Sequence, residues 1–178
     1  MRRAFVMACV GIAILAGIAV ESGYAEGSAT FQLSLFPPVQ LRDENLSISL
    51  LRLDLIYGRN VSVHGLDLGL INHCTGGTSV GLQYGIVGYV GGSFVGWQAN
   101  TIDIVKQRFS GFQSGFYNQM NNGEAVQYGI FNVATDVTGL QLGFINYTQK
   151  MYGLQIGLIN VIRQKEKLPV LPIINWSF

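Results

Sequence analysis

The sequence predicts an all-β protein, a tandem-repeat antiparallel meander that closes into a small barrel of about ten strands. Three observations support this fold class. An eight-residue phrase recurs, most clearly as GLQLGFIN from Gly139 and GLQIGLIN from Gly153, and successive copies start 14 to 16 residues apart. Each copy alternates apolar and small or polar residues with the period of a strand. Gly, Gln or Asn interrupts every apolar run after the first, so no later segment reads as a helical span.

The chain begins with the pattern of a secretory signal peptide over residues 1–25. Arg2 and Arg3 precede the uncharged stretch 4–20, and Gly23-Tyr24-Ala25 places small residues at the two cleavage-reading positions. A retained anchor helix is the alternative, although 17 apolar residues are short for a span. Residues 26–178 then form a single repeat-built β domain. Its nine Lys or Arg balance nine Asp or Glu, which argues against nucleic acid as a partner.

The strands follow in order along this domain. Phe31 to Phe36 alternates and is stopped by Pro37-Pro38. The repeats cover about 50–161, beginning with the degenerate copy LLRLDLIY. A charge run over 163–167 is expected to be a loop, and a last strand covers about 170–178. The connections are polar or Gly-rich, as turns require.

The two faces of each strand differ. In the Gly139 copy, Leu140, Leu142 and Phe144 share one face, whereas both glycines, Gln141 and Ile145 share the other. In a barrel the apolar face contacts lipid and the amides fill a narrow lumen, as a plugged structural barrel and not a wide pore. The residues at the glutamine position are therefore predicted to face the lumen: Arg52, Asp67, Gln83, Gln98, Gln113, Gln127, Gln141 and Gln155.

Asparagine ends most copies of the phrase. Because Asn tolerates left-handed backbone and starts turns, the strands are expected to end there. Strands of eight to ten residues, tilted as in a barrel, stand about 20–25 Å high, close to the ~25 Å apolar band of outer-membrane barrels. The terminal Phe178 on an alternating last strand also favours a barrel.

A β-solenoid is the main alternative, with each unit forming one coil and the leucine face buried inside. Even spacing favours it, since outer-membrane barrels alternate short turns with long loops. Pro172 also removes a hydrogen bond where a closed barrel has no free edge. The drift of the spacing from 16 to 14 residues argues for hairpins. A twisted open sheet or sandwich is a third possibility.

The sequence indicates no catalytic, cofactor-binding or metal-binding residues. His64 and His73 flank one copy, so about 30 Å of strand separates them, too far for shared ligation with Asp67 or Cys74. No nucleophile elbow accompanies the serines, and the glycines do not precede helices as phosphate-binding glycines do. A membrane hydrolase or acyltransferase remains a minor alternative.

The chain resembles a bacterial family of surface-repeat proteins with tandem GLQxGLxN units after a signal peptide. The resemblance spans about 31–178 and includes LSLFPPVQL from Leu33, LRLDLIYGRN from Leu51 and PIINWSF from Pro172. It implies a surface or outer-membrane location and no catalytic residues. The central copies depart from the pattern, since Asn100 replaces a glycine, and Gly88 and Asp103 replace the terminal Asn.

These observations predict a non-enzymatic protein of the bacterial outer membrane or cell surface. Its role would be structural, adhesive or limited permeation, with membrane lipid as the expected partner and no cofactor. The alternative is a secreted or periplasmic β-solenoid that binds a partner.

Overall fold

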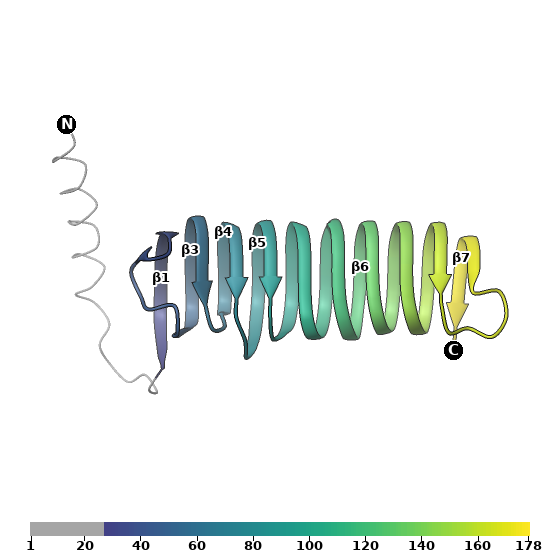
Figure 1. Ribbon diagram of the computed structural model, residues 1–178, viewed down its shortest axis with the longest axis horizontal. Coiled ribbons are helices and arrows are strands. Elements are labelled where there is room, and N and C mark those ends of the chain that lie inside the picture. Colours follow the sequence, from purple (N-terminus) through teal and green to yellow (C-terminus); the bar gives the residue numbers. More distant parts are fainter. Residues whose placement is uncertain (1–26) are drawn as a thin grey trace.

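The computed structural model describes residues 27–178, so the predicted signal peptide over residues 1–25 lies outside the described part. Figure 1 shows one sheet wound into a long coil whose turns stack along a single axis. The strands are β1 (Ser28–Phe36), β2 (Val39–Gln40), β3 (Ser47–Asn60), β4 (His64–Cys74), β5 (Thr78–Val90), β6 (Ser93–Ile162) and β7 (Val170–Ser177). The all-β, tandem-repeat nature of the chain is thus confirmed.

The predicted antiparallel barrel is wrong, and the chain is a β-solenoid. β3, β4, β5 and β6 pair in parallel, and equivalent residues of successive copies lie side by side, as in Gln83 beside Gln98. β6 runs through several turns without a break. Parallel stacking keeps identical residues in phase, whereas a hairpin would reverse every second copy. The even spacing of the repeats was the signal for this arrangement.

The solenoid is inverted relative to the predicted alternative, because its leucine face lies outside. Tyr84, Phe116 and Leu158 are more than half exposed, whereas Gln83 and Gln155 are fully buried. Gly and amide side chains fit a narrow interior that leucines would overfill. A methyl group on Gly143 would overlap the Gly129 carbonyl of the preceding turn. The repeated glycines therefore set how closely the turns stack.

Each copy begins at a backbone conformation that favours glycine. Gly139 has φ +139°, and a Cβ there would overlap the carbonyl of Ala125. The alternation then breaks at the corner after the second glycine, where Leu158 and Ile159 both lie exposed. Ile145, predicted to face inward, is likewise partly exposed. This corner returns the next asparagine to the interior.

The terminal asparagines do not start left-handed turns as the sequence predicted. Among residues 27–178, the non-glycine residues with positive φ are Leu168 and Ile173. Asn118, Asn132 and Asn146 are instead fully buried within β6. Segments expected to be connecting turns, such as 133–138, also belong to this continuous strand.

The far side of each turn contributes an apolar core. One column of buried residues pairs Cys74 with Val90 and Val90 with Val105 across successive turns. A second column includes Phe94 and Phe109, whose rings stack with centroids 5.9 Å apart. The interior therefore has a polar, mostly amide side and a hydrophobic side.

Both ends of the coil are covered by irregular strands. At the start, β2 pairs antiparallel with β1, and β1 pairs in parallel with β3. At the end, β7 runs antiparallel to the last turn of β6, with a register shift between Gly157 and Asn160. β7 also contains Pro172, and Ile173 has φ +67°. Such features discourage another strand from pairing with the edge.

Candidate functional site

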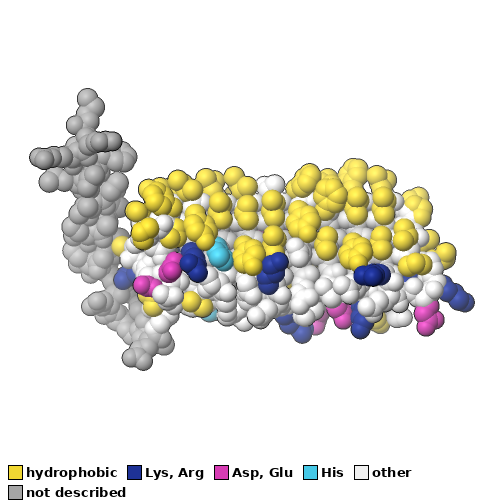
Figure 2. Space-filling view, in the orientation of Figure 1, with side chains coloured by type: hydrophobic (Ala, Val, Ile, Leu, Met, Phe, Trp, Pro, Cys, Tyr) yellow, Lys and Arg dark blue, Asp and Glu magenta, His cyan; other side chains and the backbone are white. Residues whose placement is uncertain are grey.

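An extended apolar face is formed by outward side chains of the repeats. Figure 2 shows hydrophobic side chains in a band along the coil, with most charged side chains of this view below it. We call this the apolar face, and define it by three outward rows: Leu66, Leu82, Trp97, Phe112, Val126, Leu140, Leu154; Leu68, Tyr84, Ala99, Ser114, Tyr128, Leu142, Ile156; and Leu70, Ile86, Thr101, Phe116, Ile130, Phe144, Leu158.

The three rows contain no charged residue. Their large side chains pack along the rows and around the corner, as between Trp97 and Phe112 (centroids 5.9 Å apart) and between Phe116 and Phe131 (5.6 Å). Trp97 Nε1 donates a hydrogen bond to Ser114 Oγ at 2.9 Å. The face is thus an ordered surface of neighbouring apolar groups, unlike the isolated exposed leucines that are normal in soluble proteins.

The residues predicted to line a lumen lie together in one buried ladder inside the coil. Gln155 Nε2 donates to Gln141 Oε1 at 2.7 Å, and the same bond repeats at 2.7 to 2.9 Å turn by turn through Gln127, Gln113 and Gln98 to Gln83. Gln83 Nε2 donates to Asp67 Oδ2 at 2.7 Å. Because the ladder fills the interior, these residues form a core and not the wall of an open channel.

A second ladder of asparagines runs beside the first with opposite polarity. Asn118 donates to Asn132, Asn132 to Asn146 and Asn146 to Asn160, at 2.7 to 2.8 Å. The sequence reasoning missed this ladder because it assigned the asparagines to turns. Their recurrence at one position of the repeat was the available signal, as it was for the glutamines.

The glutamine ladder ends at a buried ionic cluster near its first turn. Arg52 donates to both carboxylate oxygens of Asp67 at 2.7 and 2.8 Å, and its Nε lies 3.1 Å from Asp54 Oδ2. Burial raises the pKa of Asp54 to about 7, although the Arg52 charge opposes the shift. Removal of Arg52, or of the carboxylates that surround it, would leave an uncompensated buried charge, so this cluster is structural.

The departures from the repeat in the central turns compensate one another. Asn100 occupies the position of the second glycine, and Gly88 of the preceding turn occupies an asparagine position. A Cβ on Gly88 would overlap Asn100 Nδ2. Asp103 replaces the next asparagine and accepts a hydrogen bond from Asn100 Nδ2 at 2.5 Å. Burial raises the pKa of Asp103 to about 7, while bonds to Asn100 lower it.

The residues considered for metal binding do not converge. His64 is exposed at the start of β4, whereas Cys74 at its end is buried beside Arg52. His73 Nδ1 lies 2.7 Å from the Tyr57 hydroxyl, and burial together with Arg59 and Arg52 lowers the His73 pKa. Within residues 27–178, no group of three or more His, Cys, Asp or Glu is placed to hold a metal ion.

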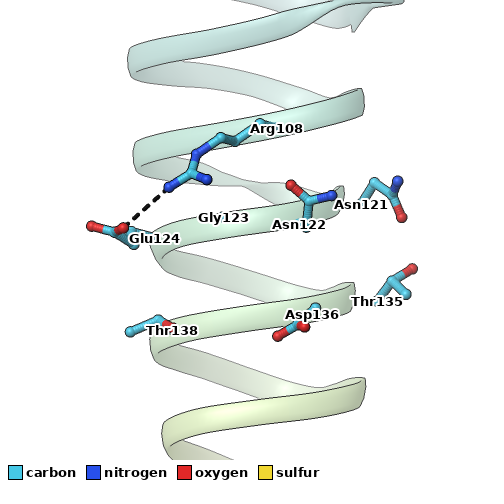
Figure 3. Close-up of a pocket in the computed structure, with 8 residues that line it drawn as sticks. All are labelled: Arg108, Asn121, Asn122, Gly123, Glu124, Thr135, Asp136 and Thr138. Atoms are coloured by element: carbon cyan, nitrogen blue, oxygen red, sulfur yellow. Dashed lines mark hydrogen bonds and ion pairs between the residues drawn. The ribbon is translucent and has the colours of Figure 1, made fainter.

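A shallow polar groove lies on one edge of the coil (Figure 3). Arg108 and Glu124 form an exposed ion pair at 3.1 Å across adjacent turns. The remaining side chains, Asn121, Asn122, Thr135, Asp136 and Thr138, point outward from successive turns and do not meet at one point. An exposed ion pair of this kind contributes little stability, and the groove offers no arranged set of catalytic groups.

No helix within the described residues has the length and hydropathy of a transmembrane span. Comparison with known proteins found no matching family model, no similar curated protein and no similar solved structure. The resemblance to surface-repeat proteins accordingly stays a prediction.

Proposed function

We propose that this chain is a non-enzymatic, exported solenoid that acts as a docking and structural module through its apolar face. The single observation that carries the proposal is the uncharged, ordered surface of three outward rows repeated over seven turns. The largest apolar patch of an ordinary monomer covers about 300–600 Å². Seven turns at ~4.8 Å and three rows about 6.6 Å apart give the defined face roughly 700 Å², and a patch above the ordinary size favours a surface that is covered in the working state.

The distribution of polar groups supports binding over catalysis. The ionic cluster of Arg52, Asp54 and Asp67 is buried, as is Asp103. Because no substrate reaches these groups in the closed coil, they have no access to solution chemistry. Exposed charged residues instead lie outside the three rows of the apolar face, as in the groove around Arg108 and Glu124. The signal-peptide pattern in residues 1–25 supports export.

The proposal is tested by measuring how much of the exported chain is found in an assembled or envelope-bound fraction. In the face variant, Tyr84→Lys is combined with Tyr128→Lys, two side chains that are 61% and 60% exposed. The control combines Asn121→Lys with Thr135→Lys in the polar groove, where both positions are exposed. We expect most of the parent and control protein in an assembled or envelope-bound fraction. The face variant should be released as a folded monomer, and its retention together with release of the control would contradict the proposal.

A further inference from the structure

We propose that the apolar face rests on a lipid bilayer, with the axis of the coil parallel to the membrane surface and the outward side chains inserted among the outermost segments of the acyl chains. This inference rests on the proposed docking role and names the partner. Four features of the coil carry it: the length of the uncharged surface, the pairing of the polar groups beneath it, its uneven relief, and the charges and aromatic rings around it.

The uncharged surface runs the whole length of the coil. The three outward rows of the apolar face continue into the strands at both ends, through Phe31 and Leu33 of β1, Leu51, Leu53 and Leu55 of β3, and Ile174 and Trp176 of β7. Together with the seven turns these make ten neighbouring strands, which at ~4.8 Å each and with rows about 6.6 Å apart span roughly 48 by 20 Å. Because the axis of the coil is straight, a planar bilayer contacts this surface from end to end (Figure 1).

Stacking of the turns satisfies the polar groups that lie beneath this surface. Backbone groups of each turn pair with the neighbouring turns, as between β4 and β5. Among the outward side chains, Trp97 Nε1 donates to Ser114 Oγ at 2.9 Å, and this hydroxyl donates to the Gln98 carbonyl at 3.5 Å. Unsatisfied polar groups are strongly disfavoured in hydrocarbon. A coil whose backbone is paired from turn to turn therefore meets the condition for placing its side chains in lipid.

The relief of the face favours a fluid partner over a rigid one. In the second row, Tyr84 and Tyr128 are 61% and 60% exposed, whereas Ala99 and Ser114 in the two turns between them are small. A rigid protein needs a matching projection to fill such a depression, because empty space at an interface forfeits packing contacts. Acyl chains are fluid and fill the depression without a matched shape.

The surface of the coil carries an excess of positive charge. Of the charged residues within 27–178, eight Lys or Arg but five Asp or Glu lie outside the buried interior. The difference arises because the interior holds three acids, Asp54, Asp67 and Asp103, and one cation, Arg52. Basic groups beside a membrane-bound apolar surface are attracted to anionic lipid headgroups. A bilayer that contains anionic lipid is therefore the partner that fits both the face and its surroundings.

Two of the surface cations lie against aromatic rings. Lys165 Nζ lies 5.0 Å from the ring centroid of Trp176, which belongs to the first outward row, and Lys106 Nζ lies 5.8 Å from that of Tyr89. Trp and Tyr rings favour the boundary between acyl chains and headgroups, and a lysine stem lies along apolar surface while its ammonium group reaches the headgroups. Both pairs thus suit the boundary layer at the margin of the face.

Tryptophan fluorescence tests this placement, because Trp97 and Trp176 are the two tryptophans of the chain and both lie in the first row. The chain is purified without detergent, as processed by an exporting bacterial host. It is mixed with vesicles of phosphatidylcholine and phosphatidylglycerol at about two to one, whose acyl chains carry bromine near the headgroup. We expect the chain to float with the vesicles and its fluorescence to fall by about half or more relative to unbrominated vesicles.

Single-tryptophan variants test the orientation of the coil. Trp176→Phe leaves the tryptophan in the middle of the coil, and Trp97→Phe leaves the one at its end. Both variants should be quenched, since the axis lies along the membrane. Quenching of Trp176 without quenching of Trp97 would mean that the coil stands on its end, and would overturn the proposal. In the control, Asn121→Trp is combined with both Trp→Phe changes, and this tryptophan of the polar groove should not be quenched.

A matched pair of variants separates burial from charge. Tyr84→Lys with Tyr128→Lys should weaken vesicle binding at least about tenfold, because two charged groups enter the face. Asn121→Lys with Thr135→Lys adds the same charge in the polar groove and should bind at least as well as the parent. Circular dichroism confirms that each variant is folded. Equal binding by both variants would overturn the face as the lipid contact.

The outcomes separate this inference from the proposed docking role. Flotation with both tryptophans unquenched would show a purely electrostatic contact and overturn the inference. Failure to float, together with release of the face variant from the envelope fraction, would overturn lipid as the partner and leave the docking role intact, with sedimentation showing whether a second copy takes its place. Failure to float, together with retention of the face variant and release of its control, would overturn both.

Discussion

The two halves of the coil fill the same interior in different ways. From Gln113 to Asn160 the turns carry unbroken glutamine and asparagine ladders, and hydrogen-bonded neighbours are 14 residues apart. From Arg52 to Asp103 they are 15 or 16 residues apart, and buried charges replace several amides. The regular half needs only neutral amides, each bonded to the next turn.

The irregular half shows the rule that both halves obey. Where a larger side chain replaces the second glycine of a repeat, a glycine replaces the asparagine that would lie beside that side chain in the stacked coil. A Cβ on Gly58 would overlap the Asp54 carboxyl, and one on Gly88 would overlap Asn100. The interior thus holds a fixed volume per turn, and deviations are tolerated as compensated pairs.

The largest expected effect comes from breaking the regular half. Gly143→Val places a branched side chain where a single methyl group already overlaps the Gly129 carbonyl and the Asn132 amide. Because both neighbours belong to stacked turns, neither has room to move. We expect a loss of at least about 4 kcal/mol in unfolding free energy, measured by urea denaturation. Valine at the exposed Phe144 is the matched control, and an equal effect there would contradict the account.

The next effect comes from the ionic cluster of the irregular half. Arg52→Met leaves Asp67 and Asp54 buried without their cation, which should cost about 3–5 kcal/mol. Converting the cluster to the regular pattern, with Arg52→Gln, Asp67→Gln and Asp54→Gly together, should recover most of that loss by extending the amide ladder. Urea denaturation measures both variants. If the triple variant is as unstable as the single one, the two halves do not follow one rule.

Gly88 and Asn100, the compensated pair in the central turns, provide a further test of the comparison between the two halves. Gly88→Asn restores the repeat at one position but overlaps Asn100, so we expect a loss of about 2–4 kcal/mol. Adding Asn100→Gly should recover most of it, because the turn then has the regular pattern. The coupling free energy from the four melting curves is the measurement. Additive effects would show that the two positions are independent.

The smallest effect is a gain. Asp103 occupies the asparagine position one turn before Asn118, where the asparagine ladder begins. Asn118 Oδ1 has no hydrogen-bond partner among the described residues. Asp103→Asn supplies an amide donor at that position and removes a buried acid. We expect the variant to be more stable than the parent by roughly 1–3 kcal/mol above pH 7.

The raised pKa of Asp103 determines how this gain in stability depends on pH. Burial raises the folded pKa of Asp103 from 3.8 to about 7, so the folded state holds a proton that the unfolded state releases between those values. The contribution of Asp103 to the stability of the parent is therefore fully present below about pH 4, and it is lost as the pH rises through about 7. Unfolding free energies at pH 5 and pH 8 should show a smaller decrease in the variant than in the parent. An equal decrease in both would contradict a raised pKa for Asp103.

The sequence predicts the composition of both faces but not the direction of the strands. Alternation of Leu140 and Gln141 places amides together and leucines together in a barrel and in this coil alike. What separates the two folds is whether identical residues stack in phase, which depends on parallel pairing between turns. The equal spacing of the copies pointed to that pairing, while Phe178 and the strand length pointed to a membrane barrel.

The irregular residues are harder to predict because their partners lie in other turns. Asn100 and Asp103 look like isolated defects along the chain, and the clash that couples Asn100 to Gly88 appears only when the turns are stacked. The exposed corner at Leu158 and Ile159 is hidden for the same reason, since strict alternation predicts one of them inside.

Distances between spin labels on the outer row test the coil most directly. Cysteines replacing Leu70 and, in separate chains, Phe116, Phe144 or Leu158 are labelled and diluted with unlabelled chain. Three, five and six stacked turns at ~4.8 Å predict separations that rise steadily, to about 14, 24 and 29 Å. In a closed barrel of about ten strands, the distance would rise and then fall as the strands return around the wall. A shorter distance for Leu158 than for Phe144 would contradict the solenoid.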